Sequence, residues 1–181
     1  EMCIRDSYIH QHPELSGQEY QTTAFLKERL EELGIRILES GLKTGLIAEI
    51  GSGQPVVALR ADIDALPILE QTNLPYQSQH PGVMHACGHD FHQTSLLGAA
   101  ALLKEKEDQL EGTVRLIFQP AEEISEGASD VLATGLLEDV QGIIGFHNIP
   151  QLKAGQLALN AGAMMAGVET VSYTHLTLPT S

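Results

Sequence analysis

Residues 56–67 read VVALRADIDALP, and they contain the pattern from which the rest of the fold follows. The apolar run that opens this stretch predicts a buried strand. Two acids, Asp62 and Asp64, come at the end of that strand with one apolar residue between them. Because ligands of open α/β sheets bind at the carboxyl ends of the strands, we look for more reactive side chains wherever another apolar run ends.

Apolar runs and helical patterns alternate along the chain. The run at residues 46–50 is joined to the run at 56–60 by the turn residues GSGQP, which predicts a hairpin-like pair of strands. Further strands are predicted at residues 35–38, 112–118, 142–146 and 155–159, and helices at 17–33, 92–106 and 128–132. This alternation of strands and helices predicts a layered α/β fold.

The helix predicted at residues 17–33 carries its own start signal. Ser16 followed three residues later by Glu19 is the capping-box pattern, in which the two side chains close the first turn of a helix. Gly34 then ends the helical spacing of apolar residues. We therefore expect Ser16 and Glu19 to serve the helix.

Composition narrows the function. Hydrophobic residues make up 43% of the 181 residues and charged residues 19%, which is typical of one globular domain. The formal net charge of −14 makes nucleic acid a poor partner. No apolar run reaches the length of a membrane span and no leader opens the chain, so we expect a soluble, cytoplasmic protein without a membrane partner.

The two ends of the chain resemble translated adaptor sequence. We expect residues 1–7 and 171–181 to be non-native tails, and we base no prediction of the fold on them. Cys3 and His175 would then carry no function.

Residues 84–92, MHACGHDFH, contain the densest group of metal-ligand residue types. Cys87 and His89 lie two apart, so in an extended segment their side chains point the same way. Thiolate and imidazole are both good ligands for zinc-like ions. A lone cysteine is usually part of the core, but the neighbouring histidines and acid favour a pair of ligands here.

Two other predicted strands end in similar residues. Glu122 and Glu123 follow one of them, and adjacent carboxylates can divide roles, one binding metal and the other acting as general base. Taken alone, such a pair is more often a solvated charge pair, and His147 after the next strand is more often a core histidine. Together these residues suit two cations better than one, with Asp62 and Asp64 either binding metal or orienting imidazoles.

Short strings along the chain resemble the aminoacylase and hippurate hydrolase branch of the di-metal amidohydrolase and peptidase superfamily. They are HQHPELS (10–16), RADIDALP (60–67), HACGHD (85–90), QPAEE (119–123) and GFHNIP (145–150). The likeness covers residues 8–170. It implies a layered α/β/α catalytic domain of a zinc-peptidase-like fold, of which these residues are the N-terminal part.

The resemblance also implies a role for each residue of the site. The implied metal ligands are Cys87, His89, Glu123 and His147, with Glu122 as general base and Asp64 supporting the site. The metals would be two divalent ions, Zn²⁺ or Mn²⁺, with Co²⁺ and Ni²⁺ as alternatives. The role of Asp62 stays open, and we interpret His85 and His92 as structural.

The function implied by the resemblance is hydrolysis of the amide bond of small N-acyl amino acids to a carboxylate and an amino acid. In this branch the chain leaves the catalytic domain near Met164 for an inserted lid, through which the enzymes form homodimers. We expect that lid, and the last histidine ligand beyond it, to be missing here. Two alternatives remain, a dipeptidase or aminopeptidase of the same superfamily and an inactive metal-binding fragment. Cys87 stands where peptidase branches carry an acid, which favours the amidohydrolase.

Overall fold

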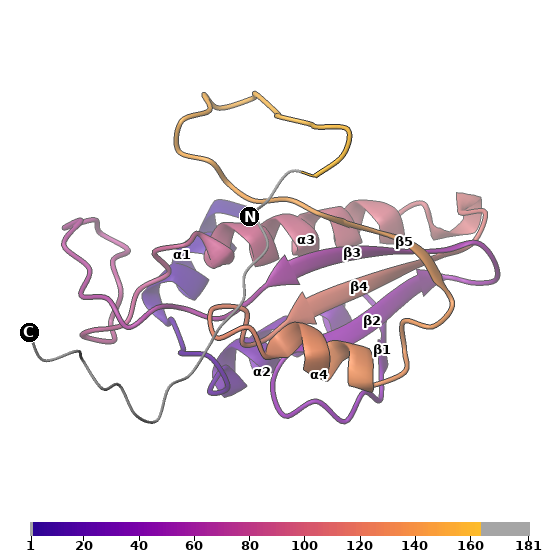
Figure 1. The fold of residues 1–181 in the computed structure, drawn as a ribbon, viewed down its shortest axis with the longest axis horizontal. Coiled ribbons are helices and arrows are strands. Elements are labelled where there is room, and N and C mark those ends of the chain that lie inside the picture. The colour runs from indigo at the N-terminus through magenta and orange to yellow at the C-terminus, as the bar shows by residue number, and fades with distance from the viewer. Residues whose placement is uncertain (1, 164–181) are drawn as a thin grey trace, which may run out of the picture. The chain divides into compact units, whose positions relative to one another are not determined.

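The computed structural model describes residues 2–163, with side chains from Ser7 onward, and the predicted tail at 171–181 and Met164 lie outside it. The chain divides into two units, one reaching Asn148 and the other starting at Ile149. The first unit contains the helices and strands drawn in Figure 1, which are α1 (Met2–Gln11), α2 (Tyr20–Glu32), β1 (Arg36–Leu38), β2 (Leu46–Gly51), β3 (Val56–Asp62), α3 (His89–Lys104), the 3₁₀ turn η1 (Glu107–Gln109), β4 (Thr113–Gln119), α4 (Gly127–Ala133) and β5 (Val140–Gly145).

The strands form one mixed sheet in the order β1-β2-β4-β3-β5. β3 runs parallel to both β4 and β5, whereas β2 is antiparallel to β4 and to β1. β4 thus lies between β2 and β3, and the predicted hairpin-like pair of these two strands is wrong. The turn residues at 51–55 reverse the chain, but the apolar residues of β4 pair with both strands and separate them.

Helices cover both faces of the sheet, as the α/β/α expectation requires (Figure 1). Side chains alternate between the two faces along each strand. On β2, Ala48 and Ile50 face a core shared with α2 and α3, whereas Ile47 faces a second core shared with Val131 of α4. The layered fold predicted from the sequence is therefore confirmed.

Some predicted boundaries are wrong. α2 begins at Tyr20 rather than at residue 17, and the side chain of its N-cap residue, Glu19, makes no capping hydrogen bond, so the predicted capping box is wrong. α3 begins at His89 rather than at residue 92. Residues 2–7 lie in the predicted N-terminal tail and belong to α1, a helix that was not predicted, and their non-native origin stays a prediction.

The second unit is described from Ile149 to residue 163. No strand forms at residues 155–159, contrary to the prediction, and Leu157 and Leu159 are 87% and 92% exposed. An alternating apolar pattern becomes a strand only where a neighbouring strand pairs with it, and the described part of this unit offers none. Among residues 2–163, no helix has the length and apolar character needed to cross a bilayer.

Candidate metal centre

The carboxyl ends of three parallel strands lie at one edge of the sheet. Asp62 at the end of β3 pairs in register with Gln119 at the end of β4, and β5 ends alongside them. Glu122 and Glu123 follow β4, and His147 follows β5. The register therefore brings the acids and the histidine predicted from the sequence to a common edge.

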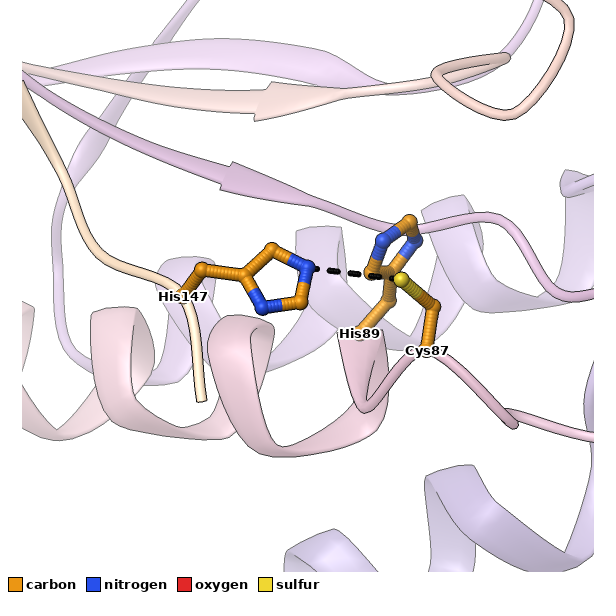
Figure 2. Close-up of side chains that lie close together, drawn as sticks. All are labelled: Cys87, His89 and His147. Carbon is orange, nitrogen blue, oxygen red and sulfur yellow. Dashed lines mark hydrogen bonds between the residues drawn. The ribbon is translucent and has the colours of Figure 1, made fainter. Parts of the chain in front are cut away.

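The first residues of α3 complete this arrangement. Figure 2 shows His147 reaching from the segment after β5 toward Cys87 and His89, which stand at the start of α3. One ligand atom from each of the three residues lies within 4.8 Å of the others. Cys87 lies in a turn, not in an extended segment as predicted, so its side chain meets that of His89 because Gly88 bends the backbone between them with a φ of 82°.

Both histidines present the same ring nitrogen to the cluster. The Nδ1 atom of His89 donates to the backbone carbonyl of Asp64 at 2.9 Å, and that of His147 lies 2.8 Å from the carbonyl of Asn148. Each Nε2 is therefore left with a lone pair, and that of His147 lies 3.3 Å from the Sγ atom of Cys87. Fixing the tautomer in this way is the usual preparation of a histidine for metal binding.

A second group of ligand atoms shares His89 with the first. The Nε2 atom of His89 lies 3.8 Å from Oε1 of Glu123 and 3.9 Å from Oε2 of Glu122. Both Nε2 of His89 and Oε1 of Glu123 are buried without a hydrogen-bond partner among the described residues. Unpartnered buried atoms are costly, and a cation between them would remove that cost. The residues present therefore fit two neighbouring cations.

His92 belongs to this region as well, although the sequence analysis interpreted it as structural. Its ring lies one helical turn after His89, and its Nδ1 is 3.8 Å from Oδ2 of Asp62. Its Nε2 is 2.7 Å from Oδ1 of Asn148, the residue after His147. His92 lies three residues after His89 on a helix, and this spacing could have predicted that the two rings lie side by side in the candidate site.

Asp62 is paired with a cation of the chain itself. Its Oδ2 accepts from Nη1 of Arg60 at 2.9 Å, and its Oδ1 is paired with Nη2 of the same guanidinium.

His85, which precedes the Cys87 turn, is buried as well. Burial lowers the pKa of its imidazole to about 4.

Burial and the neighbouring carboxylates shift the pKa values of two side chains in the site. Burial raises the pKa of the Cys87 thiol to about 12, with further contributions from Glu123, Glu122 and Asp62. Burial and the charge of Asp62 also raise the pKa of Glu122 above its ordinary value. A thiol with such a pKa is a poor nucleophile by itself, and a bound cation would favour its ionised, ligating form.

Asp64 is buried but stays ionised. Burial alone would raise its pKa, but hydrogen bonds from His89, Ser16 and the backbone of Glu123 hold it below its usual value. Its Oδ2 accepts from Oγ of Ser16 at 2.7 Å and from the N–H of Glu123 at 3.0 Å. Asp64 therefore connects the histidine of α3 to the turn that carries the glutamates.

The chain is similar to known proteins over most of its length. The model of the peptidase family M20/M25/M40 matches residues 58–179. An N-acetyl-L-cysteine deacetylase of Bacillus subtilis is 54% identical over 164 residues, which are 90% of this chain and 39% of the relative. The IAA-amino acid hydrolase ILR1-like 5 of Arabidopsis thaliana is 48% identical over 160 residues, 88% of this chain and 37% of that relative.

Solved structures of the same family are also similar to this chain. The YXEP protein of Bacillus subtilis, a dinuclear metal-binding peptidase from the M20 family, matches with a TM-score of 0.82 and 55% sequence identity. The match covers 83% of this chain and 43% of that one. The chain thus spans about two fifths of the length of the relatives that it matches.

Proposed function

Because this chain belongs to the peptidase family M20/M25/M40, we propose that it forms part of a metal-dependent hydrolase of N-acyl amino acids. Residues 8–170 would be the N-terminal part of its catalytic domain. The relatives named as a deacetylase and as an amino acid hydrolase support this substrate class. The observation that carries the proposal is the meeting of Cys87, His89 and His147 beside two glutamates at one sheet edge.

We propose that Cys87, His89, Glu123 and His147 hold two divalent cations. The dinuclear M20 structure supports the number of ions. A thiolate ligand favours Zn²⁺, with Mn²⁺, Co²⁺ and Ni²⁺ as alternatives. When bound, the pair would supply the Lewis acidity that lowers the pKa of a water and polarises an amide carbonyl.

The residues of the chain would then move the proton. Glu122 is the carboxylate of the pair whose side chain is more exposed, 40% against 19% for Glu123, so it faces the space open to water and substrate. It takes the proton of the attacking water and delivers it to the leaving nitrogen, which yields a carboxylate and a free amino acid. Its raised pKa suits an acid that must both accept and return a proton.

Substituting Glu122 by Gln tests this assignment. In the whole protein we expect turnover of N-acetyl amino acids to fall by about 10²–10⁴-fold, the usual size of a general-base effect, while the metal content stays unchanged. Turnover would be measured by release of free amine, and metal by elemental analysis. Near-wild-type turnover in this variant would overturn the role of Glu122.

A substrate panel separates the amidohydrolase from a peptidase of the same family. N-acetyl and N-benzoyl amino acids should be cleaved and unblocked dipeptides should not, with chelator-treated protein as the control. Preference for dipeptides would replace the proposed substrate class while leaving the metal assignment intact. Dimerisation through a lid domain and a cytoplasmic location stay predictions.

A further inference from the structure

Glu19 is a fully buried acid whose side chain does not cap the helix that follows it. It directly precedes α2, but its side chain makes no capping hydrogen bond there. Its Oε1 accepts instead from the backbone N–H of Ala121 at 2.8 Å, and its Oε2 has no partner among the described residues. Burying a carboxyl group with one oxygen unpartnered costs stability, and the hydrogen bond to Ala121 offsets part of that cost.

Ala121 is the residue that such a contact would secure. Its φ of 49° lies in the left-handed region, which is unfavourable for an L-residue with a Cβ. Its carbonyl accepts from the N–H of Gly127 at 3.1 Å, closing the turn that contains Glu122 and Glu123. The backbone of the turn is closely packed, because a Cβ on Gly127 would lie 1.6 Å from the carbonyl oxygen of Pro120. Backbone of this kind persists only where its surroundings hold it.

Residues 16–19, the segment that carries Glu19, also contact the backbone of Glu123, through Ser16 and Asp64. The hydroxyl of Ser16 donates to Oδ2 of Asp64, and that oxygen accepts from the N–H of Glu123. Residues 16 and 19 thus secure the backbone immediately before Glu122 and at Glu123. The side chains that resemble a capping box hold the candidate site instead of the helix.

We propose that Glu19 is a positioning residue, which holds Ala121 in its left-handed conformation and so aims Glu122 and Glu123 into the metal centre. This inference rests on the proposed function for its catalytic consequence. Its structural part, the dependence of the turn on Glu19, stands on the hydrogen bond and the backbone geometry alone.

Two substitutions of similar chain length test the hydrogen bond. Glu19→Gln keeps the shape and an acceptor oxygen, whereas Glu19→Met keeps an unbranched side chain of similar length without an oxygen acceptor. In the whole protein we expect kcat to fall by about 10–100-fold in Glu19→Met with KM within about threefold, because small displacements of catalytic groups have effects of this size. Glu19→Gln should recover most of the lost turnover.

Glu14 supplies a matched control in the same segment. Its carboxylate accepts from the N–H groups of Gln21 and Thr22 at the start of α2, away from the turn. Glu14→Ala should lower the melting temperature and leave kcat unchanged. If Glu14→Ala and Glu19→Met lose kcat in proportion to their loss of melting temperature, Glu19 is only structural and the proposal is overturned.

Two further readouts do not depend on hydrolysis. The visible spectrum of the Co²⁺-loaded protein should change in Glu19→Met and return in Glu19→Gln, because Glu123 is a proposed ligand. Hydrogen exchange of the amide of Ala121 should accelerate in Glu19→Met without any metal, and not in Glu14→Ala. Unchanged exchange would overturn the proposal. Accelerated exchange in a protein that cleaves no N-acyl amino acid would support the role of Glu19 in the turn and contradict the proposed function.

Discussion

The two histidines of Figure 2 are held to different degrees. His89 is 1% exposed, and its Nδ1 lies 2.9 and 3.2 Å from two oxygens of Asp64. His147 is exposed, and within residues 2–163 its Nδ1 bonds to the carbonyl of its own neighbour, Asn148. We infer that the part of the site around His89 is organised before any cation binds, whereas the position of His147 depends more on the cation.

The strands that end at this edge of the sheet, before Glu122 and Glu123 in one case and before His147 in the other, differ in the same way. β4, in the middle of the sheet, buries nearly every side chain, whereas β5 at the edge exposes all but its first residue. Packing in the interior fixes side chains in single rotamers, and an exposed edge does not. The burial of each strand thus explains how firmly its end of the site is built.

The largest expected effect breaks the site at its shared residue. His89 occurs in each group of candidate ligands, whereas His147 occurs in one. We expect His89→Ala to weaken divalent-cation binding by on the order of 10³-fold or more, beyond what loss of a supporting residue costs, and His147→Ala to weaken it less. Competition with a chromophoric chelator measures both affinities, and equal losses would remove the distinction between the two histidines.

The next effect compares the strands themselves. Ile47 of β2 is fully buried and Ile144 of β5 is 68% exposed. We expect Ile47→Ala to lower the free energy of unfolding by about 2–5 kcal/mol, and Ile144→Ala by less than about 0.5 kcal/mol. Chemical denaturation of the two variants gives these values. A comparable loss from Ile144→Ala would show that β5 is covered in solution.

A smaller effect tests what holds His89. Asp64→Asn replaces the carboxylate that binds Nδ1 of His89 and the N–H of Glu123. We expect it to weaken cation binding by about 10–100-fold, as other losses of a ligand's supporting carboxylate do. Asn148→Ala keeps the carbonyl that holds His147, so its affinity should stay within about threefold of wild type. Chelator competition measures both, and the reverse order would contradict the comparison.

The smallest expected effect is on stability and concerns His10, which contacts Asp90, the residue after His89 in α3. The Nδ1 atom of His10 lies 2.7 Å from Oδ2 of Asp90, and its Nε2 lies 3.1 Å from Oε1 of Glu70. The hydrogen bond to Asp90 raises the pKa of His10 from 6.5 to about 9, against the lowering effect of burial. The folded state therefore retains a proton that the unfolded state loses first.

The pH dependence follows from the sign of this shift. The stabilisation by His10 is fully present below pH 6.5 while its partners stay ionised, and it is lost as the pH rises through about 9. We expect a loss on the order of 1–2 kcal/mol, reduced from the full shift because the ring edge reaches solvent. Urea unfolding at pH 6.5 and pH 9.5 measures it, and His10→Gln should flatten the difference. A variant with the same slope as wild type would exclude His10 as the source.

The sequence allowed the strand ends to be predicted because each consists of an apolar run followed by a reactive residue. Asp64, Glu123 and His147 all follow such runs, and the structure brings them to one edge. Strand neighbours were harder to predict, since the order of a sheet depends on pairing between distant segments. The separation of β2 from β3 by β4 is such a case.

The roles of Ser16 and Glu19 show another limit. Their spacing fits a capping box, and the local pattern contains nothing that distinguishes it from a pair of side chains turned toward the core. Only the position of residues 64 and 121 in space makes the second use visible. Local patterns predict elements well here and predict contacts between distant segments poorly.

The insertion of β4 between β2 and β3 has a consequence for synthesis on the ribosome. β2 and β3 emerge before β4, and each lacks this common neighbour until residues 113–119 have left the exit tunnel. During the synthesis of the whole of α3, the edges of β2 and β3 that will pair with β4 are without that partner. Chaperones that recognise exposed apolar strands would bind this protein during that interval.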